Sequence, residues 1–245
     1  MNNLLFATIG AAIASFLGVI IERSDYKFAK LNGRSRCNRC KRQLLWWENI
    51  PVLSFILLRG KCRNCRSPIP CWLPLIEIAG ALAGVVVAAE ISQISQIRLI
   101  GLILIAAALI WIFFSDLVKG VVPDWAVVLG AAGALIWQIG QISLIWPILI
   151  ALAAAAFFWF LVVVTRGRGM GTGDVTLAFF LGLWLGWPKI LVGIWLAFLL
   201  GAAAALALIA SKRKKFGQTV PFGPFLITGA ILAYFYGEKV ILWFL

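Results

Sequence analysis

The chain alternates long apolar runs with short polar loops, and the runs have lengths typical of membrane-spanning helices. Such a helix needs about 20 mostly apolar residues, or fewer where flanking side chains reach the membrane surface. Eight runs fit, at about 4–21, 71–91, 99–115, 125–141, 143–164, 174–187, 190–210 and 220–236. The pattern therefore predicts an all-α polytopic membrane protein with about eight transmembrane helices. The run at 174–187 is the shortest of the eight and ends at Gly-Trp-Pro.

The composition supports this class and excludes others. Of the 245 residues, 63% are hydrophobic and 13% are charged, whereas a soluble domain is nearer one half and one quarter. The chain contains no histidine, which excludes Ser-His, Cys-His and His-zinc chemistry. Any proton transfer must therefore use carboxylates, Lys, Tyr or Cys.

The basic residues predict how the chain is oriented. Twelve of the 22 Lys and Arg lie between Arg23 and Arg66, directly after the first apolar run. The positive-inside rule places this loop in the cytoplasm and the N-terminus outside. Continued along the chain, the rule puts 19 bases in inside loops and 3 in outside loops, so both termini are expected outside. We interpret the first run as a retained helix and not as a signal peptide, because no basic residue precedes it.

Four of the five cysteines form two CxxC pairs, Cys37 with Cys40 and Cys62 with Cys65. Two such pairs predict a tetrahedral zinc site, closed by four thiolates and therefore structural. A loop of this size rarely folds without such a staple, so we expect a small cytoplasmic zinc-binding loop domain. Reduced cytoplasmic thiols favour metal, although a redox dithiol pair stays open as the alternative. Cys71 is expected to be a small buried apolar side chain.

The excess of bases in this loop has two interpretations. Nucleic-acid binding would need a recognition helix or a stacking platform, and the loop shows little sign of either. Attraction to anionic lipid headgroups is the default for a loop that is tethered to the bilayer at both ends. We therefore expect membrane lipid, and no nucleic acid, as a partner.

The nine acidic residues divide into two groups. Five are expected to be solvated, since they lie near span ends or in the zinc loop: Glu22, Asp25, Glu48, Glu90 and Glu238. Four remain as functional candidates because ionisable groups at membrane depth are costly: Glu77, Asp116, Asp124 and Asp174.

Asp116 and Asp174 are predicted at the same, cytoplasmic face. Asp116 ends an apolar run, and Asp174 follows the glycine-rich loop 169–173, whose glycines permit close approach and positive φ angles. Two carboxylates in one cavity share a proton, so that one activates water while the other polarises the scissile carbonyl. This is peptide hydrolysis without histidine or metal. Two alternatives stay open: Asp174 could simply cap its helix, and a Ser-Lys dyad is formally available.

Several motifs occur in a characteristic order. They are ASFL at 14–17 with Arg23, the two CxxC pairs, ENIPVLS at 48–54, LP at 73–74 with Glu77, Asp116, VPD at 122–124, GMGTGD at 169–174 and PFGPF at 221–225. Together they resemble the type IV prepilin peptidases, the GxGD-type aspartic proteases, along nearly the whole chain.

The resemblance implies a function and a set of roles. Asp116 and Asp174 would form the catalytic dyad, Gly171 and Gly173 would shape its loop, and Asp124 and Glu77 would support. The substrate would be a prepilin or pseudopilin, whose basic leader is cut after Gly at the cytoplasmic face of the bacterial inner membrane. Many members also methylate the new N-terminal residue with S-adenosylmethionine. Residues 1–92 would be the methyltransferase-associated part, and residues 93–245 the membrane-embedded peptidase domain.

The sequence departs from the usual family pattern at three positions. Gly18 stands where Asn is common, Leu73 where Tyr precedes the proline, and Thr176 where Lys is usual. The first two bear on methylation and the third on substrate preference. The alternative from another class is a transporter or membrane scaffold, in which the buried acids form an ion pathway and the zinc loop recruits a partner. No oligomeric state is predicted.

Overall fold

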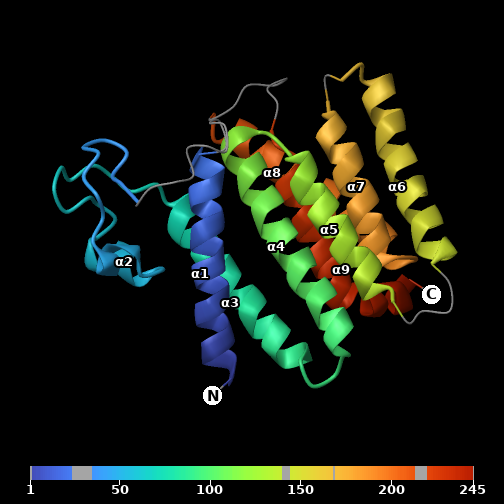
Figure 1. Cartoon of the computed structure of the whole chain (residues 1–245). Helices are drawn as coiled ribbons and strands as arrows, with labels where there is room; N and C mark the ends of the chain where they lie inside the picture. The colour runs from blue at the N-terminus through green and yellow to red at the C-terminus, as the bar shows by residue number, and fades with distance from the viewer. Residues whose placement is uncertain (1, 24–34, 140–143, 168, 213–219, 245) are drawn as a thin grey trace. The chain divides into compact units, whose positions relative to one another are not determined.

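The structure is a computed structural model that describes residues 2–23, 35–139, 144–167, 169–212 and 220–244. The described chain is almost entirely helical and forms two compact units, Met1–Ser95 and Gln96–Leu245 (Figure 1). The first unit contains α1 (Asn2–Arg23), the 3-10 helix η2 (Trp46–Asn49), α2 (Leu53–Leu57) and α3 (Trp72–Glu90). The second contains α4 (Gln96–Lys119), α5 (Asp124–Trp137), α6 (Ile145–Val164), α7 (Thr172–Leu185), α8 (Lys189–Ala210) and α9 (Gly223–Phe244).

Each of the eight predicted runs corresponds to one helix, which confirms the fold class. Six helices are long and apolar enough to cross a membrane, namely α1, α3, α4, α6, α8 and α9. The other two, α5 and α7, are apolar but shorter, with 14 residues each. The run at 174–187 forms α7 and ends where Gly186 adopts a φ of 66°, a conformation that favours glycine after a helix.

In the first unit, α1 and α3 lie side by side with their backbones in close contact. Three glycines make this approach possible: a Cβ on Gly84 would overlap the carbonyl of Phe6, and Gly10 faces Gly80 in the same way. Small residues at such contacts are typical of helix packing in membranes. Residues 35–71, which we call the cysteine lobe, connect to α3 and carry η2 and α2.

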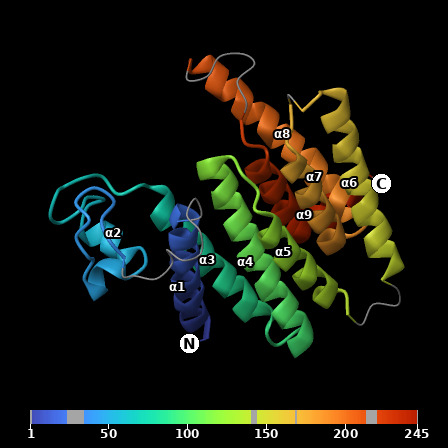
Figure 2. The same ribbon diagram turned by 45° about the horizontal axis from the view of Figure 1, so that its top comes forward.

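In the second unit, neighbouring helices pair as α4 with α5, α6 with α7 and α8 with α9 (Figure 2). The most enclosed helix is α7, because nine of its 14 residues are buried. By contrast, α6 buries only three residues and lies at the edge of the unit. The end of α4 and the starts of α5, α7 and α9 meet at one end of the unit, and the two candidate catalytic aspartates lie there.

Candidate active site and metal centre

Asp116 lies in the last turn of α4 and is buried. Its Oδ2 accepts a hydrogen bond of 2.9 Å from the backbone N–H of Gly223, the first residue of α9. The first N–H groups of a helix have no partner within the helix and form its positive end, so they suit a carboxylate. A Cβ on Gly223 would lie 2.6 Å from this oxygen. Glycine is therefore required for α9 to begin this close to Asp116.

Asp174 lies in the first turn of α7 and is also buried. Its Oδ2 accepts from the N–H of Gly171 at 3.2 Å, and its own N–H donates to the carbonyl of Gly171 at 3.2 Å. Asp174 therefore does cap α7, as one alternative held. Capping engages only one carboxylate oxygen of Asp174, so it does not exclude a catalytic role for this side chain.

The loop between α4 and α5 contacts the residues that directly precede each of the two acids. The hydroxyl of the buried Ser115 donates to the carbonyl of Val121 at 2.9 Å, which closes the loop after α4. A Cβ on Gly173 would lie 2.9 Å from Cβ of Val122, so the start of α7 approaches this loop as closely as glycine allows. The expected close approach of the glycine loop is therefore present at Gly173.

The positive φ angles that this loop permits do not occur at Gly169, Gly171 or Gly173. The left-handed turn occurs earlier, at Arg166 and Gly167, with φ angles of 52° and 71°. The reason is that α7 begins at Thr172, so the residues around its start take extended or helical conformations. Gly171 instead offers its N–H to Asp174, and a Cβ there would meet nothing nearer than 3.9 Å.

Each acid keeps one carboxylate oxygen available. Within the described part of the chain, the hydrogen bonds of Asp116 and Asp174 all involve Oδ2. In general, two carboxyl groups within a few ångströms of each other can share a proton and bind water between them. Asp124 differs, because it is exposed in the first turn of α5 and no described residue forms a hydrogen bond or ion pair with its side chain. A supporting role for Asp124 stays a prediction.

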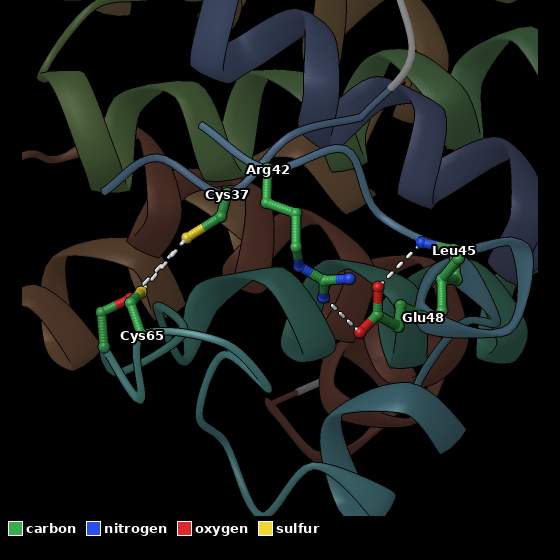
Figure 3. A network of polar contacts seen from close by, with 6 residues as sticks. Cys37, Arg42, Leu45, Glu48 and Cys65 are labelled. Atoms are coloured by element: carbon green, nitrogen blue, oxygen red, sulfur yellow. Dashed lines mark hydrogen bonds and ion pairs between the residues drawn. The ribbon is translucent and has the colours of Figure 1, made fainter. Parts of the chain in front are cut away.

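The four paired cysteines come together in the cysteine lobe. Their sulfur atoms all lie within 4.8 Å of one another, and Sγ of Cys37 and Cys65 are 3.7 Å apart (Figure 3). Metal–sulfur bonds of about 2.3 Å in a tetrahedron put the sulfurs about 3.8 Å apart, so the cluster fits a tetrahedral metal ion. All five cysteines are free thiols, and none is in a disulfide. Cys71 is exposed at the start of α3, so the expectation that it is buried is wrong.

The two CxxC pairs are built alike. In each, the first cysteine donates its N–H to a carbonyl five residues on: Cys37 to Arg42 at 2.9 Å and Cys62 to Ser67 at 2.8 Å. The residue after the second cysteine has a positive φ, 58° at Lys41 and 53° at Arg66. These tight turns bring both sulfurs of a pair to the same side, which is what a four-thiolate site needs.

The surroundings of Cys37 favour its thiolate. Burial opposes the charge, but the N–H groups of Cys40 and Arg39 and the side chains of Cys62 and Ser67 outweigh it and lower the pKa of Cys37 to about 6. Metal ligation requires the thiolate form. The Cys37 side chain therefore favours the ionised form that binds a metal cation.

Glu48 is buried in the lobe, which contradicts the expectation that it is solvated. Its carboxylate accepts from Arg42 Nη2 at 2.6 Å and from the N–H of Leu45 at 2.7 Å (Figure 3). Burial opposes its charge, but these two donors outweigh it and hold the pKa of Glu48 below its usual value. Among the other acids in that group, Glu238 is exposed as expected, and Asp25 lies outside the described residues.

Glu77 joins three segments of the first unit. One oxygen accepts from the hydroxyl of Ser15 on α1 and the other from the N–H of Val52, each at 2.7 Å. Val52 has a φ of 61°, an unfavourable angle for a β-branched residue, at the start of α2. The sequence marked Glu77 but gave no indication of these partners. It also did not indicate that Gly18 and Leu73, two departures from the family pattern, are neighbours: a Cβ added at Gly18 would lie 3.4 Å from Cδ2 of Leu73.

Comparison with known proteins covers both units. The bacterial peptidase A24 N-terminal domain matches residues 8–91, and the type IV leader peptidase family matches residues 103–206. A prepilin leader peptidase/N-methyltransferase of Burkholderia pseudomallei strain 1026b is 38% identical over 98% of this chain and 87% of its own length. The chain belongs to the type IV leader peptidase family. This confirms the resemblance and sets aside the transporter or scaffold alternative.

Other relatives agree with this assignment. A prepilin leader peptidase/N-methyltransferase of Aeromonas hydrophila is 32% identical over 86% of this chain and 74% of its own length. No solved structure matches. With its six long apolar helices, this leader peptidase is a multi-pass protein of the inner membrane.

Loss of the metal site is expected to unfold the cysteine lobe of the peptidase. Chelation or Cys37→Ser should expose residues 35–71 to protease, because only Glu48 and Cys62 are buried in the lobe, which therefore has almost no apolar core of its own. Limited proteolysis with mass-spectrometric mapping measures the effect. Cys71→Ser is the control and should stay resistant, since Cys71 lies outside the cluster. Resistance of Cys37→Ser equal to that of the parent chain contradicts the metal site.

Glu48→Ala is expected to destabilise the lobe by about 2 kcal/mol, because Arg42 and the Leu45 N–H lose their shared acceptor. Because the pKa of Glu48 is depressed, its contribution is present at neutral pH and is lost as the pH falls through that lowered pKa. Urea-induced metal release at several pH values measures this. Asn38→Ala is the control: it loses one exposed hydrogen bond, to Glu22, and should cost about 0.5 kcal/mol. Equal effects of the two variants would contradict the role of Glu48.

Proposed function

We propose that this peptidase is an aspartic endopeptidase that removes the basic leader from type IV prepilins or pseudopilins by cutting after a Gly. Asp116 and Asp174 are its catalytic pair. Gly171 and Gly173 shape the catalytic loop, Asp124 supports the fold of the same unit, and Glu77 supports the fold of the first unit. The observation that carries this proposal is that both buried acids are held through Oδ2 by backbone N–H groups at helix starts.

The reaction follows from this arrangement. One aspartate, ionised, takes a proton from a water molecule between the pair, and the water oxygen attacks the scissile carbonyl carbon. The other aspartate, protonated, donates to the carbonyl oxygen as charge develops there. The C–N bond then breaks, and the departing amine takes up a proton from the pair. The open space around Gly171 suits an extended peptide backbone next to Asp174.

The distribution of basic residues supports an orientation for the reaction. It favours a cytoplasmic cysteine lobe and an N-terminus outside. On this topology, the end of the second unit that holds both aspartates faces the cytoplasm. A basic leader stays in the cytoplasm while the apolar helix of the substrate enters the bilayer, so the scissile bond falls at this depth.

We also propose that the enzyme methylates the new N-terminal residue of the product. The names of the relatives support this second activity, and the N-terminal domain match supports its location in residues 1–92. S-adenosylmethionine supplies the methyl group when it is bound. The metal of the four-cysteine cluster is proposed to be Zn²⁺, because thiolates at tetrahedral spacing suit it. Its role is structural, because four protein ligands leave no open position.

The test is incubation of the purified enzyme with a prepilin, with and without S-adenosylmethionine, followed by mass spectrometry of the product N-terminus. We expect cleavage after Gly in both reactions and the added mass of one methyl group only with S-adenosylmethionine. An uncut prepilin contradicts the peptidase proposal. A cut product that stays unmethylated with S-adenosylmethionine present contradicts the second activity alone.

A further inference from the structure

The cysteine lobe presents a cluster of large apolar side chains that no part of the described chain covers. Trp46 of η2 and Leu53, Ile56 and Leu57 of α2 are between 56% and 75% exposed. We call these four residues the apolar tip. They belong to a segment outside the membrane-spanning helices, where exposed apolar clusters usually mark a contact surface.

Hydrogen bonds determine the depth of the apolar tip along the helices of its own unit. Val52 directly precedes α2 and donates its N–H to Glu77 at 2.7 Å, while Ser15 donates to the same carboxylate. Glu77 lies about 7.5 Å inside the start of α3, and Ser15 lies about 12 Å inside the end of α1, at 1.5 Å per residue. Figure 1 shows α2 level with the middle of α1 and not beyond its end. The apolar tip therefore begins at a depth where α1 and α3 are within the apolar part of the membrane.

The charges of the lobe suit the same location. The described lobe holds eight bases and one acid, Glu48, whose carboxylate is buried and paired with Arg42. No exposed acid of the lobe would therefore be carried into the bilayer. Bases that flank an apolar surface attract anionic headgroups, while their long side chains extend to the membrane surface.

We propose that the apolar tip is inserted into the acyl region of the leaflet next to the cysteine lobe, so that the lobe is an interfacial membrane anchor. Glu77 positions it by accepting from both Ser15 and Val52. The sequence suggested only a lobe lying on the membrane surface. The occupant of the apolar surface is lipid, because the two helices that fix the depth of the tip are themselves membrane spans.

The experiment compares two cysteine variants of the full chain in nanodiscs that contain anionic lipid. Both carry Cys71→Ser, which removes the exposed thiol outside the metal cluster. Ile56→Cys places a thiol in the apolar tip, and Gln43→Cys places one at an exposed polar position of the same lobe. A membrane-impermeant maleimide measures access, with the parent Cys71→Ser chain as background. A fluorophore on each new thiol then measures quenching by nitroxides on the acyl chain or the headgroup.

We expect the maleimide to react about tenfold or more slowly with Ile56→Cys than with Gln43→Cys, and acyl-chain nitroxide to quench the fluorophore at position 56. Equal reaction rates overturn the proposal. Slow reaction without acyl-chain quenching also overturns it, because protein and not lipid then covers the tip. If that protection disappears in discs with a single copy of the chain, the covering partner is a second copy. Retention of metal by both variants establishes that the lobe is folded.

Discussion

Asp116→Asn is expected to lower leader cleavage by about 10²–10⁴-fold, because an amide cannot exchange the proton that the two acids share. The substitution keeps the size of the side chain and leaves an oxygen that can accept from the Gly223 N–H. The chain should therefore fold and enter the membrane normally. The measurement is the rate of prepilin cleavage by purified enzyme, with thermal stability recorded on the same sample.

Asp174→Asn should have an effect of the same size, since the pair acts as one unit. Asp124→Asn is the matched control, because it makes the same chemical change in an exposed aspartate at the start of α5. We expect it to retain most activity. Full processing by Asp116→Asn or Asp174→Asn would contradict the catalytic pair, and loss of activity in all three variants would point to an effect of charge alone.

Gly223→Ala is expected to lower kcat by about a hundredfold with little change in KM, because the new methyl group displaces a catalytic carboxylate and leaves the substrate surface intact. The Cβ of the new alanine would lie 2.6 Å from Oδ2 of Asp116, which is too close for both atoms to keep their positions. Either the carboxylate moves or α9 begins farther away. In both cases the hydrogen bond that positions Asp116 is weakened.

Gly193→Ala is the control for this variant. Gly193 is also a buried helix glycine of the second unit, on α8. A Cβ added there would lie 3.4 Å from Ala230, its nearest neighbour, which is an ordinary van der Waals distance. We expect parental activity and stability from it. A Gly223→Ala enzyme with parental kcat would show that the Gly223 N–H does not position Asp116. A loss confined to KM would place the residue in substrate binding instead.

Features that depend on nearby residues could be predicted from the sequence. The eight apolar runs became eight helices because lipid requires each segment to satisfy its own backbone hydrogen bonds. The CxxC pairs could be identified for a similar reason, since each turn is closed by hydrogen bonds between residues five apart or fewer.

Features that depend on burial in the folded chain, or on the exact start of a helix, were missed or wrong. Glu48 was expected in solvent, yet the folded lobe surrounds it with Arg42 and the Leu45 N–H. Cys71 was expected to be buried, because its neighbours in the sequence are apolar, but it is exposed at the start of α3. The glycines before Asp174 permitted positive φ angles but adopt none. The start of α7 instead places the bend at Gly167.

The sequence by itself determined the class of the protein, its candidate metal ligands and the few acids that could perform catalysis. Composition, spacing and the absence of histidine are properties of the chain that do not depend on folding. Only the tertiary structure decided which backbone groups hold those acids. The N–H that binds Asp116 is 107 residues away in the chain, and Glu77 binds groups 62 and 25 residues away. No local pattern encodes such contacts, because they exist only after the helices have packed.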